Sequence, residues 1–140
     1  GKMVDFELWI DGEKGKTVNP LLFSRDADEF ANKLAKESSK TVNNRTQLRK
    51  FYDEVLRLDA LAKNDSRDWS AILPQLHMLV AKAAYARGRE LVSQSFLDFI
   101  RKAGEKVGTR ADLHVFSSYF EAIMGFCKFY EMKGRQEGRK

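Results

Sequence analysis

The most apolar part of this chain reads FSSYFEAIMGFCKFY and runs from Phe116 to Tyr130. Apolar residues recur there every three or four positions, which predicts an α-helix over about residues 111–132. They lie on two stripes: one holds Leu113, Phe116, Phe120, Ile123, Cys127 and Tyr130, and the other holds Val115, Tyr119, Ala122, Phe126 and Phe129. A helix with two apolar faces is either the central helix of a bundle or one that buries a face in another subunit, and the first interpretation is favoured.

Four other segments have helical periodicity. We predict helices over about residues 25–37, 45–63 and 74–87, and from 93 to between 104 and 108. Ser24 is a suitable N-cap for the first helix, and Pro74 suits the first turn of the third, with Gly88 as its stop. Ser93 or Ser95 begins the fourth. The predicted fold class is therefore all-α, a compact bundle of about five helices with a short non-helical N-terminal arm.

The first twenty residues do not follow a helical pattern. Apolar residues alternate with other residues at Val4, Phe6, Leu8 and Ile10, and a turn signal follows at Asp11-Gly12. This pattern favours an extended or strand-like segment. We expect three parts in the chain: an N-terminal arm over residues 1–20, a helical bundle domain over 21–133, and a mobile basic tail over 134–140.

The charge of the chain points to an anionic partner. The net charge is +5, and residues 1–31 hold seven acids against four bases, so the basic surface belongs to the bundle and the tail. The single cysteine, Cys127, cannot form an internal disulfide. No apolar run approaches the roughly 18 residues that cross a bilayer. We expect a soluble, cytoplasmic protein with no membrane partner.

The residues that usually carry catalysis or ligate metals are sparse. Neither His77 nor His114 lies in a metal-binding motif such as H-E-x-x-H, and the single cysteine cannot supply a C-x-x-C pair. The glycines match neither a phosphate-binding loop nor a dinucleotide fingerprint. We therefore expect no catalytic residues, no metal, no cofactor and no small-molecule substrate, and predict that the protein is not an enzyme.

Two runs interleave cations with aromatic residues at helical spacing, TQLRKFY from Thr46 to Tyr52 and KAAYARGR from Lys82 to Arg89. Arg and Lys supply charge for phosphates, and Tyr supplies a flat ring with a polar tip. The candidate nucleic-acid-binding residues are Lys40, Arg45, Arg49, Lys50, Tyr52, Lys82, Tyr85, Arg87 and Arg89. Either tyrosine could instead belong to the core. Helical packing is expected to place both clusters on one side.

Three motifs resemble one family in the expected order. TQLRKFYDEV from Thr46 to Val55, LHMLVAKAAYARGR from Leu76 to Arg89, and the stretch from Phe116 to Tyr130 resemble the small subunit of the Csm effector complex of type III-A CRISPR systems. The arm over residues 1–20 does not contribute to the resemblance.

The resemblance implies a helical, non-catalytic protein of antiviral defence. Such subunits stack in several copies along the inner filament of a ribonucleoprotein, beside other Csm subunits and against the guide RNA and its paired target RNA. The basic surface of the family corresponds here to Arg45, Arg49, Lys50, Lys82, Arg87 and Arg89. The alternative is a helical protein-protein adaptor that does not bind nucleic acid directly and whose charges keep it soluble.

Overall fold

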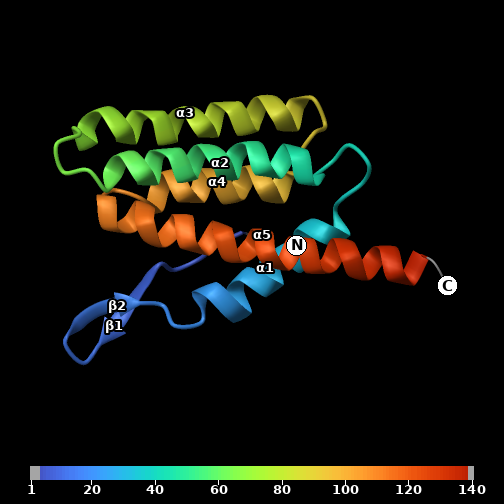
Figure 1. Ribbon diagram of the computed structural model, residues 1–140, viewed down its shortest axis with the longest axis horizontal. Helices are drawn as coiled ribbons and strands as arrows, with labels where there is room; N and C mark the ends of the chain where they lie inside the picture. Colours follow the sequence, from blue (N-terminus) through green and yellow to red (C-terminus); the bar gives the residue numbers. More distant parts are fainter. Residues whose placement is uncertain (1–3, 139–140) are drawn as a thin grey trace.

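Helices dominate the computed structural model, which describes residues 4–138 (Figure 1). Over these residues the chain forms five α-helices, one π-helical turn and one two-stranded sheet. The elements are β1 (Trp9–Gly12), β2 (Gly15–Val18), η1 (Leu22–Asp26), α1 (Ala27–Lys36), α2 (Arg45–Ala62), α3 (Trp69–Gly88), α4 (Gln94–Lys106) and α5 (Arg110–Gly138). The predicted all-α bundle of about five helices is confirmed.

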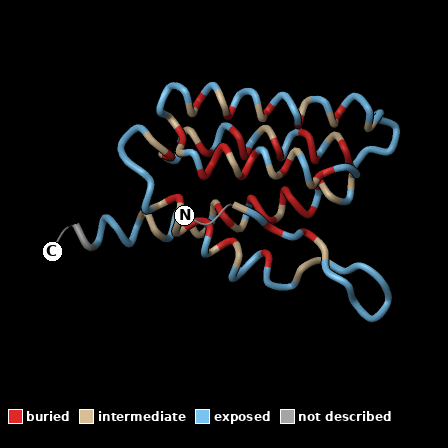
Figure 2. The backbone as a smooth tube through the Cα atoms, turned by 180° about the vertical axis from the view of Figure 1, so that it is seen from behind, coloured by how far each residue is buried: buried red, intermediate tan, exposed pale blue. Residues whose placement is uncertain are grey.

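Helices α2 and α3 run antiparallel, with α2 between α3 and α5, while α1 packs along α5 (Figure 1). The buried residues line the facing sides of the helices (Figure 2). Phe99 of α4 is at the centre of the core, with ring centroids of six aromatic neighbours 4.8–5.9 Å away: Phe6, Phe30, Phe96, Phe116, Tyr119 and Phe120. Aromatic side chains from four segments of the chain therefore form one core.

Helix α5 is central over its first half and projects from the bundle over its last turns. Both apolar stripes are buried as far as Ile123, except for the half-buried Ala122. Beyond it Phe129 is 57% exposed and Met132 is 41% exposed, and the last turns project past the other helices (Figure 2). The helix extends at least to Gly138, so the expected end near Met132 is wrong. The helix continues through residues 134–138, where we expected a mobile tail, and residues 139–140 lie outside the described part.

The helix starts follow local capping chemistry. The Asn44 side chain accepts a hydrogen bond from Gln47 N at the start of α2, and Ser93 accepts one from Phe96 N at the start of α4. Helix α3 begins at Trp69, where Asp68 accepts from Ser70 N. Pro74 therefore lies in the second turn of α3, and its expected place in the first turn is wrong. Pro74 has no N–H to donate to the carbonyl of Ser70, one turn earlier. The helix tolerates the proline because Ser70 is exposed and water can bind this carbonyl.

The start of α1 also differs from the prediction. Ser24 lies within η1 and caps nothing, because the chain enters α1 directly from this π-helical turn. Leu22 of η1 is fully buried, whereas its neighbours Leu21 and Phe23 are about two-fifths exposed. Burial of Leu22 anchors the turn in place of a side-chain cap.

Helix α5 starts with a reciprocal cap. Asp112 Oδ2 accepts from Gly108 N at 2.9 Å and from Thr109 N at 3.1 Å, and Thr109 Oγ1 accepts from Asp112 N at 3.1 Å. Asp112 Oδ1 also accepts from Trp9 Nε1 at 2.8 Å. Burial alone would raise the pKa of Asp112, but these hydrogen bonds outweigh it and hold the pKa below its usual value.

Asp112→Asn is expected to lower the free energy of unfolding near neutral pH by about 1–2 kcal/mol, because the ionised carboxylate accepts bonds that the amide accepts less well. The folded-state pKa is depressed, so this stabilisation is complete above the unfolded-state pKa of about 3.9 and is lost as pH falls through the folded-state value. Urea unfolding at a series of pH values measures the difference. Asp65→Asn, in the exposed loop between α2 and α3, is the control. The free energies of unfolding of the wild type and Asp112→Asn should converge as the pH falls. If their difference stays constant in acid, this explanation fails.

The N-terminal segment forms a strap followed by a hairpin. Residues 4–8 cross the bundle and bury Phe6 and Leu8 in the core. The strands β1 and β2 then pair antiparallel, with Trp9 opposite Val18 and Gly12 opposite Gly15, and the hairpin projects from the bundle (Figure 1). Gly15 has φ of 109°, which a residue with a Cβ rarely adopts.

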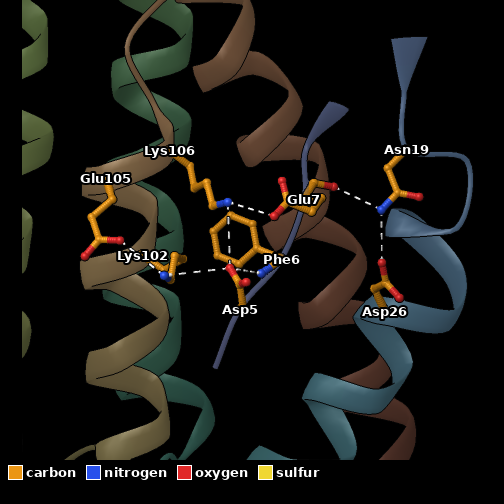
Figure 3. Close-up of polar contacts among 8 residues, drawn as sticks. All are labelled: Asp5, Phe6, Glu7, Asn19, Asp26, Lys102, Glu105 and Lys106. Carbon is orange, nitrogen blue, oxygen red and sulfur yellow. Dashed lines mark hydrogen bonds and ion pairs between the residues drawn. The ribbon is translucent and has the colours of Figure 1, made fainter. Parts of the chain in front are cut away.

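Charged side chains fasten the strap to α4 (Figure 3). Lys106 Nζ lies 2.9 Å from Glu7 Oε1 and 3.8 Å from Asp5 Oδ1, and Lys102 Nζ lies 3.8 Å from the same Asp5 oxygen. The hydrogen bond to Glu7 raises the pKa of Lys106 above its usual value. On the other side, Asn19 Nδ2 donates to the Glu7 carbonyl at 3.0 Å. The strap is thus an integral part of the bundle.

Candidate nucleic-acid interface

The two basic clusters lie at the same end of the bundle. Because α2 and α3 are antiparallel, the first turns of α2 lie beside the last turns of α3 (Figure 1). Asn43 ties their flanking loops together: its N donates to Leu91 O at 3.0 Å, and its Oδ1 accepts from Ser93 N at 2.9 Å. Asn43 is buried and has φ of 57°. A short polar side chain suits this left-handed position.

A groove opens at this end between the loop that follows α1, the start of α2 and the distal half of α5. Its volume is about 810 Å³. Apolar groups at its base come from three helices: Leu34 of α1, Leu48 of α2, and Met124 and Cys127 of α5. The burial of Cys127 raises the pKa of its thiol to about 12, so the thiol stays protonated near neutral pH and contributes an apolar surface.

Cations line both sides of the groove. Lys40, Arg45 and Arg49 come from the α1–α2 loop and α2, and Lys128 and Arg135 come from α5. Glu131 is the one carboxylate among the described lining residues, and it pairs with Arg135 at 2.9 Å. Such an excess of positive charge around a concave surface attracts an anion.

Lys50 extends this surface along α2. It borders a shallow hollow with Arg45, Arg49 and Asp53, where Arg49 Nε lies 3.8 Å from Asp53 Oδ1. Both partners of that pair are more than half exposed, so the pair is weak and Arg49 can exchange it for a phosphate at little cost. Four of the nine predicted residues, Lys40, Arg45, Arg49 and Lys50, therefore gather at the groove.

The α3 residues occupy a second place at the same end, separated from α5 by α2 (Figure 1). Lys82, Tyr85 and Arg89 are exposed. Arg87 is half-buried, and its Nε has no hydrogen-bond acceptor among the described residues. The α3 cations thus lie near the groove without lining it.

Tyr52 does not reach either surface. It is 8% exposed, and its ring packs on Phe120 with a centroid distance of 5.3 Å. Burial also raises the pKa of its hydroxyl. Its apolar position on α2, one helical turn from Leu48, is a core position, so we remove Tyr52 from the candidate interface.

Lys128 and Arg135 were missed by the sequence analysis. The lining residues Met124, Lys128, Glu131 and Arg135 recur at helical spacing along one face of α5. The signal lay in the sequence, but Arg135 was assigned to a mobile tail because the helix was expected to end near Met132. Recognising the longer helix would have placed both cations on one face.

The histidines serve elsewhere. His114 Nδ1 lies 3.1 Å from Asp59 Oδ2, which joins α5 to α2 at a distance from the groove. His77 is exposed on α3 and packs close to Gly104 of α4. A Cβ added at Gly104 would lie only 3.4 Å from His77 Nδ1. Within residues 4–138, no three His, Cys, Asp or Glu side chains gather as a metal site would require. No helix in this range combines the length and apolarity needed to cross a membrane.

The fold and the groove together define a small helical-bundle protein with an anion-attracting surface at one end. The family model for Csm2 Type III-A matches residues 21–133, and the chain belongs to this family of small subunits of the type III-A CRISPR effector complex. No curated protein and no solved structure shows a significant match to the chain. The family identification from the three motifs is confirmed, and the matched range leaves out the strap and the hairpin.

Proposed function

We propose that this protein is a non-catalytic RNA-binding structural subunit of a type III-A CRISPR ribonucleoprotein, acting in the cytoplasm in antiviral defence without a cofactor or small-molecule substrate. Its groove binds the backbone of guide RNA and target RNA. The observation that carries the proposal is the convergence of five cations from separate segments on one groove with a single carboxylate. Phosphate oxygens are the acceptors that such a surface binds best.

The proposed binding is independent of base sequence. In a guided complex, base pairing between guide and target supplies sequence recognition, so a subunit beside them need only bind backbone and shape. The groove cations of α2 are long, exposed side chains that can follow a flexible strand. Neighbouring subunits of the Csm complex then carry any catalysis.

The triple variant Arg45→Ala/Arg49→Ala/Lys128→Ala tests the groove. We expect its affinity for single-stranded RNA to fall about tenfold to a hundredfold at physiological salt, because three phosphate contacts and their counterion release are lost. The slope of log affinity against log salt should decrease by about two units. Fluorescence anisotropy of labelled RNA, titrated with the full chain over a range of salt concentrations, measures both quantities.

A charge-matched variant controls for net charge. Lys14→Ala/Arg67→Ala/Arg101→Ala removes three exposed cations from the hairpin, the α2–α3 loop and α4, away from the groove. It should bind RNA within about twofold of the wild type. Equal losses of RNA affinity in both triple variants would show that the effect depends on net charge alone. Unchanged binding in the groove variant would refute the proposed surface.

A protein-protein role is the second candidate, and the distal part of α5 favours it. Phe129 and Met132 are exposed there on turns that project from the bundle. Apolar groups in such a position fit a contact with another Csm subunit or a further copy of this chain in the filament. A complex with purified subunits that forms without RNA and is insensitive to salt, together with no RNA binding by the chain, would favour the adaptor function.

A further inference from the structure

The outward face of α3 carries an open aromatic ring. Tyr85 is 66% exposed, more than any other large apolar side chain in the described residues. Ala81 and Gly88, four residues before and three after it, have no side chain long enough to cover the ring. A flat partner can therefore approach from solvent the part of the ring that the Arg89 guanidinium does not cover.

Arg89 fixes the position of this ring. Its guanidinium lies over the ring, 5.8 Å from the centroid, and its Nη1 donates to the Tyr85 hydroxyl at 3.3 Å. The cation–π contact and the hydrogen bond restrict the tyrosine rotamer, so less conformational entropy is lost when a ligand binds. They also hold a positive charge at the edge of the exposed surface.

The charge around the ring favours a nucleic acid over a protein. The segment from Met78 to Arg89 contains Lys82, Arg87 and Arg89 and no acidic residue, and the nearby acids are Glu90, which follows it, and Glu54 of α2. Lys82 is one turn before Tyr85 and Arg89 is one turn after it, and both are exposed. An aromatic ring between cations matches a single strand, in which a base stacks on the ring and the phosphates on either side meet the charges.

We propose that Tyr85 is a stacking platform for one unpaired RNA base, with Lys82 and Arg89 contacting the flanking phosphates. The inference rests on the proposed function and adds a preference to it. The groove binds backbone in either a single strand or a duplex, whereas a base within a duplex is already stacked and is not free to lie on Tyr85. This protein therefore binds single-stranded RNA more tightly than duplex RNA.

Tyr85→Ala and Tyr85→Phe test the ring against its hydroxyl. Affinity of the full chain is measured for a single-stranded oligouridylate and for an RNA duplex of the same length. We expect Tyr85→Ala to weaken single-strand binding about tenfold and to leave duplex binding within about twofold, because one base stack is lost. Tyr85→Phe keeps the ring and should stay within about twofold on both. Met78→Ala, at an exposed position on the same helix, is the control.

A second readout locates the base. Irradiation of the wild-type complex with RNA containing 5-iodouridine should attach the RNA to the peptide that contains Tyr85, as identified by mass spectrometry. Equal single-strand affinity for Tyr85→Ala and wild type, equal losses on single strand and duplex, or crosslinks confined to other peptides would each overturn the stacking inference. If the groove variant still loses RNA affinity in those cases, the proposed function stands. If the wild type binds no RNA at any salt concentration, both fail.

Discussion

Phe6→Ala should lower the free energy of unfolding by about 3–5 kcal/mol. Phe6 lies in the strap rather than in a helix, yet it is only 5% exposed. Its ring lies 5.2 Å from that of Tyr119, 5.7 Å from Phe99 and 5.8 Å from Phe116, measured between centroids. Removal of the ring leaves a cavity among side chains held by α4 and α5, which cannot move in to fill it.

Urea unfolding followed by circular dichroism measures this loss. Ile10→Ala, on the projecting hairpin with a 39% exposed side chain, is the control and should cost less than about 1 kcal/mol. If Phe6→Ala is as stable as this control, the strap is detached in solution and the bundle stands without it.

The change Phe99→Ala is expected to cost still more, about 4–5 kcal/mol. Phe99 is 1% exposed and has six aromatic neighbours, four of them in the first half of α5 and the strap. Its position in the interior of α4 fixes the backbone, so the cavity stays open. A loss of this size removes a quarter or more of the stability of an ordinary domain, which is about 5–15 kcal/mol.

Phe129→Ala is the matched control, because it removes the same side chain from a 57% exposed position. Its cost in the isolated chain should be below about 1 kcal/mol. The double variant Phe6→Ala/Phe99→Ala should lose less than the sum of the single losses, since the two rings touch and share one cavity. Strict additivity, or a Phe99→Ala cost near that of Phe129→Ala, would contradict the described core.

The bundle was predictable because its helices carry clear periodic patterns and conventional caps. Both ends of α2 and the Ser93 cap of α4 follow directly from the residues. The start of α3 differs from the prediction because Pro74 is typical of a first helical turn, whereas Asp68 with Ser70 provides the stronger cap. The docking of the strap was not predictable, since it depends on contacts with residues about a hundred positions away.

The candidate interface was predictable in composition but not in shape. Lys40, Arg45, Arg49 and Lys50 were found by charge alone, because they are close in sequence. The groove needs α5 as its opposite wall, and the packing of α5 against α1 and α2 brings Lys128 and Arg135 there. Tyr52 and Tyr85 have similar sequence surroundings, and only tertiary packing buries the first and exposes the second.

The strap also fixes the order in which this protein can fold. Trp9 bonds to a partner 103 positions later and Glu7 to one 99 positions later. On the ribosome the strap emerges well before α4 and α5, so Phe6 and Leu8 have no docking surface until most of the chain is made. Local helical contacts form ahead of such distant ones, because closing the long intervening loop costs entropy. Docking of the strap is then a late step of folding, and a nascent chain that stalls before α5 leaves two core side chains exposed to aggregation.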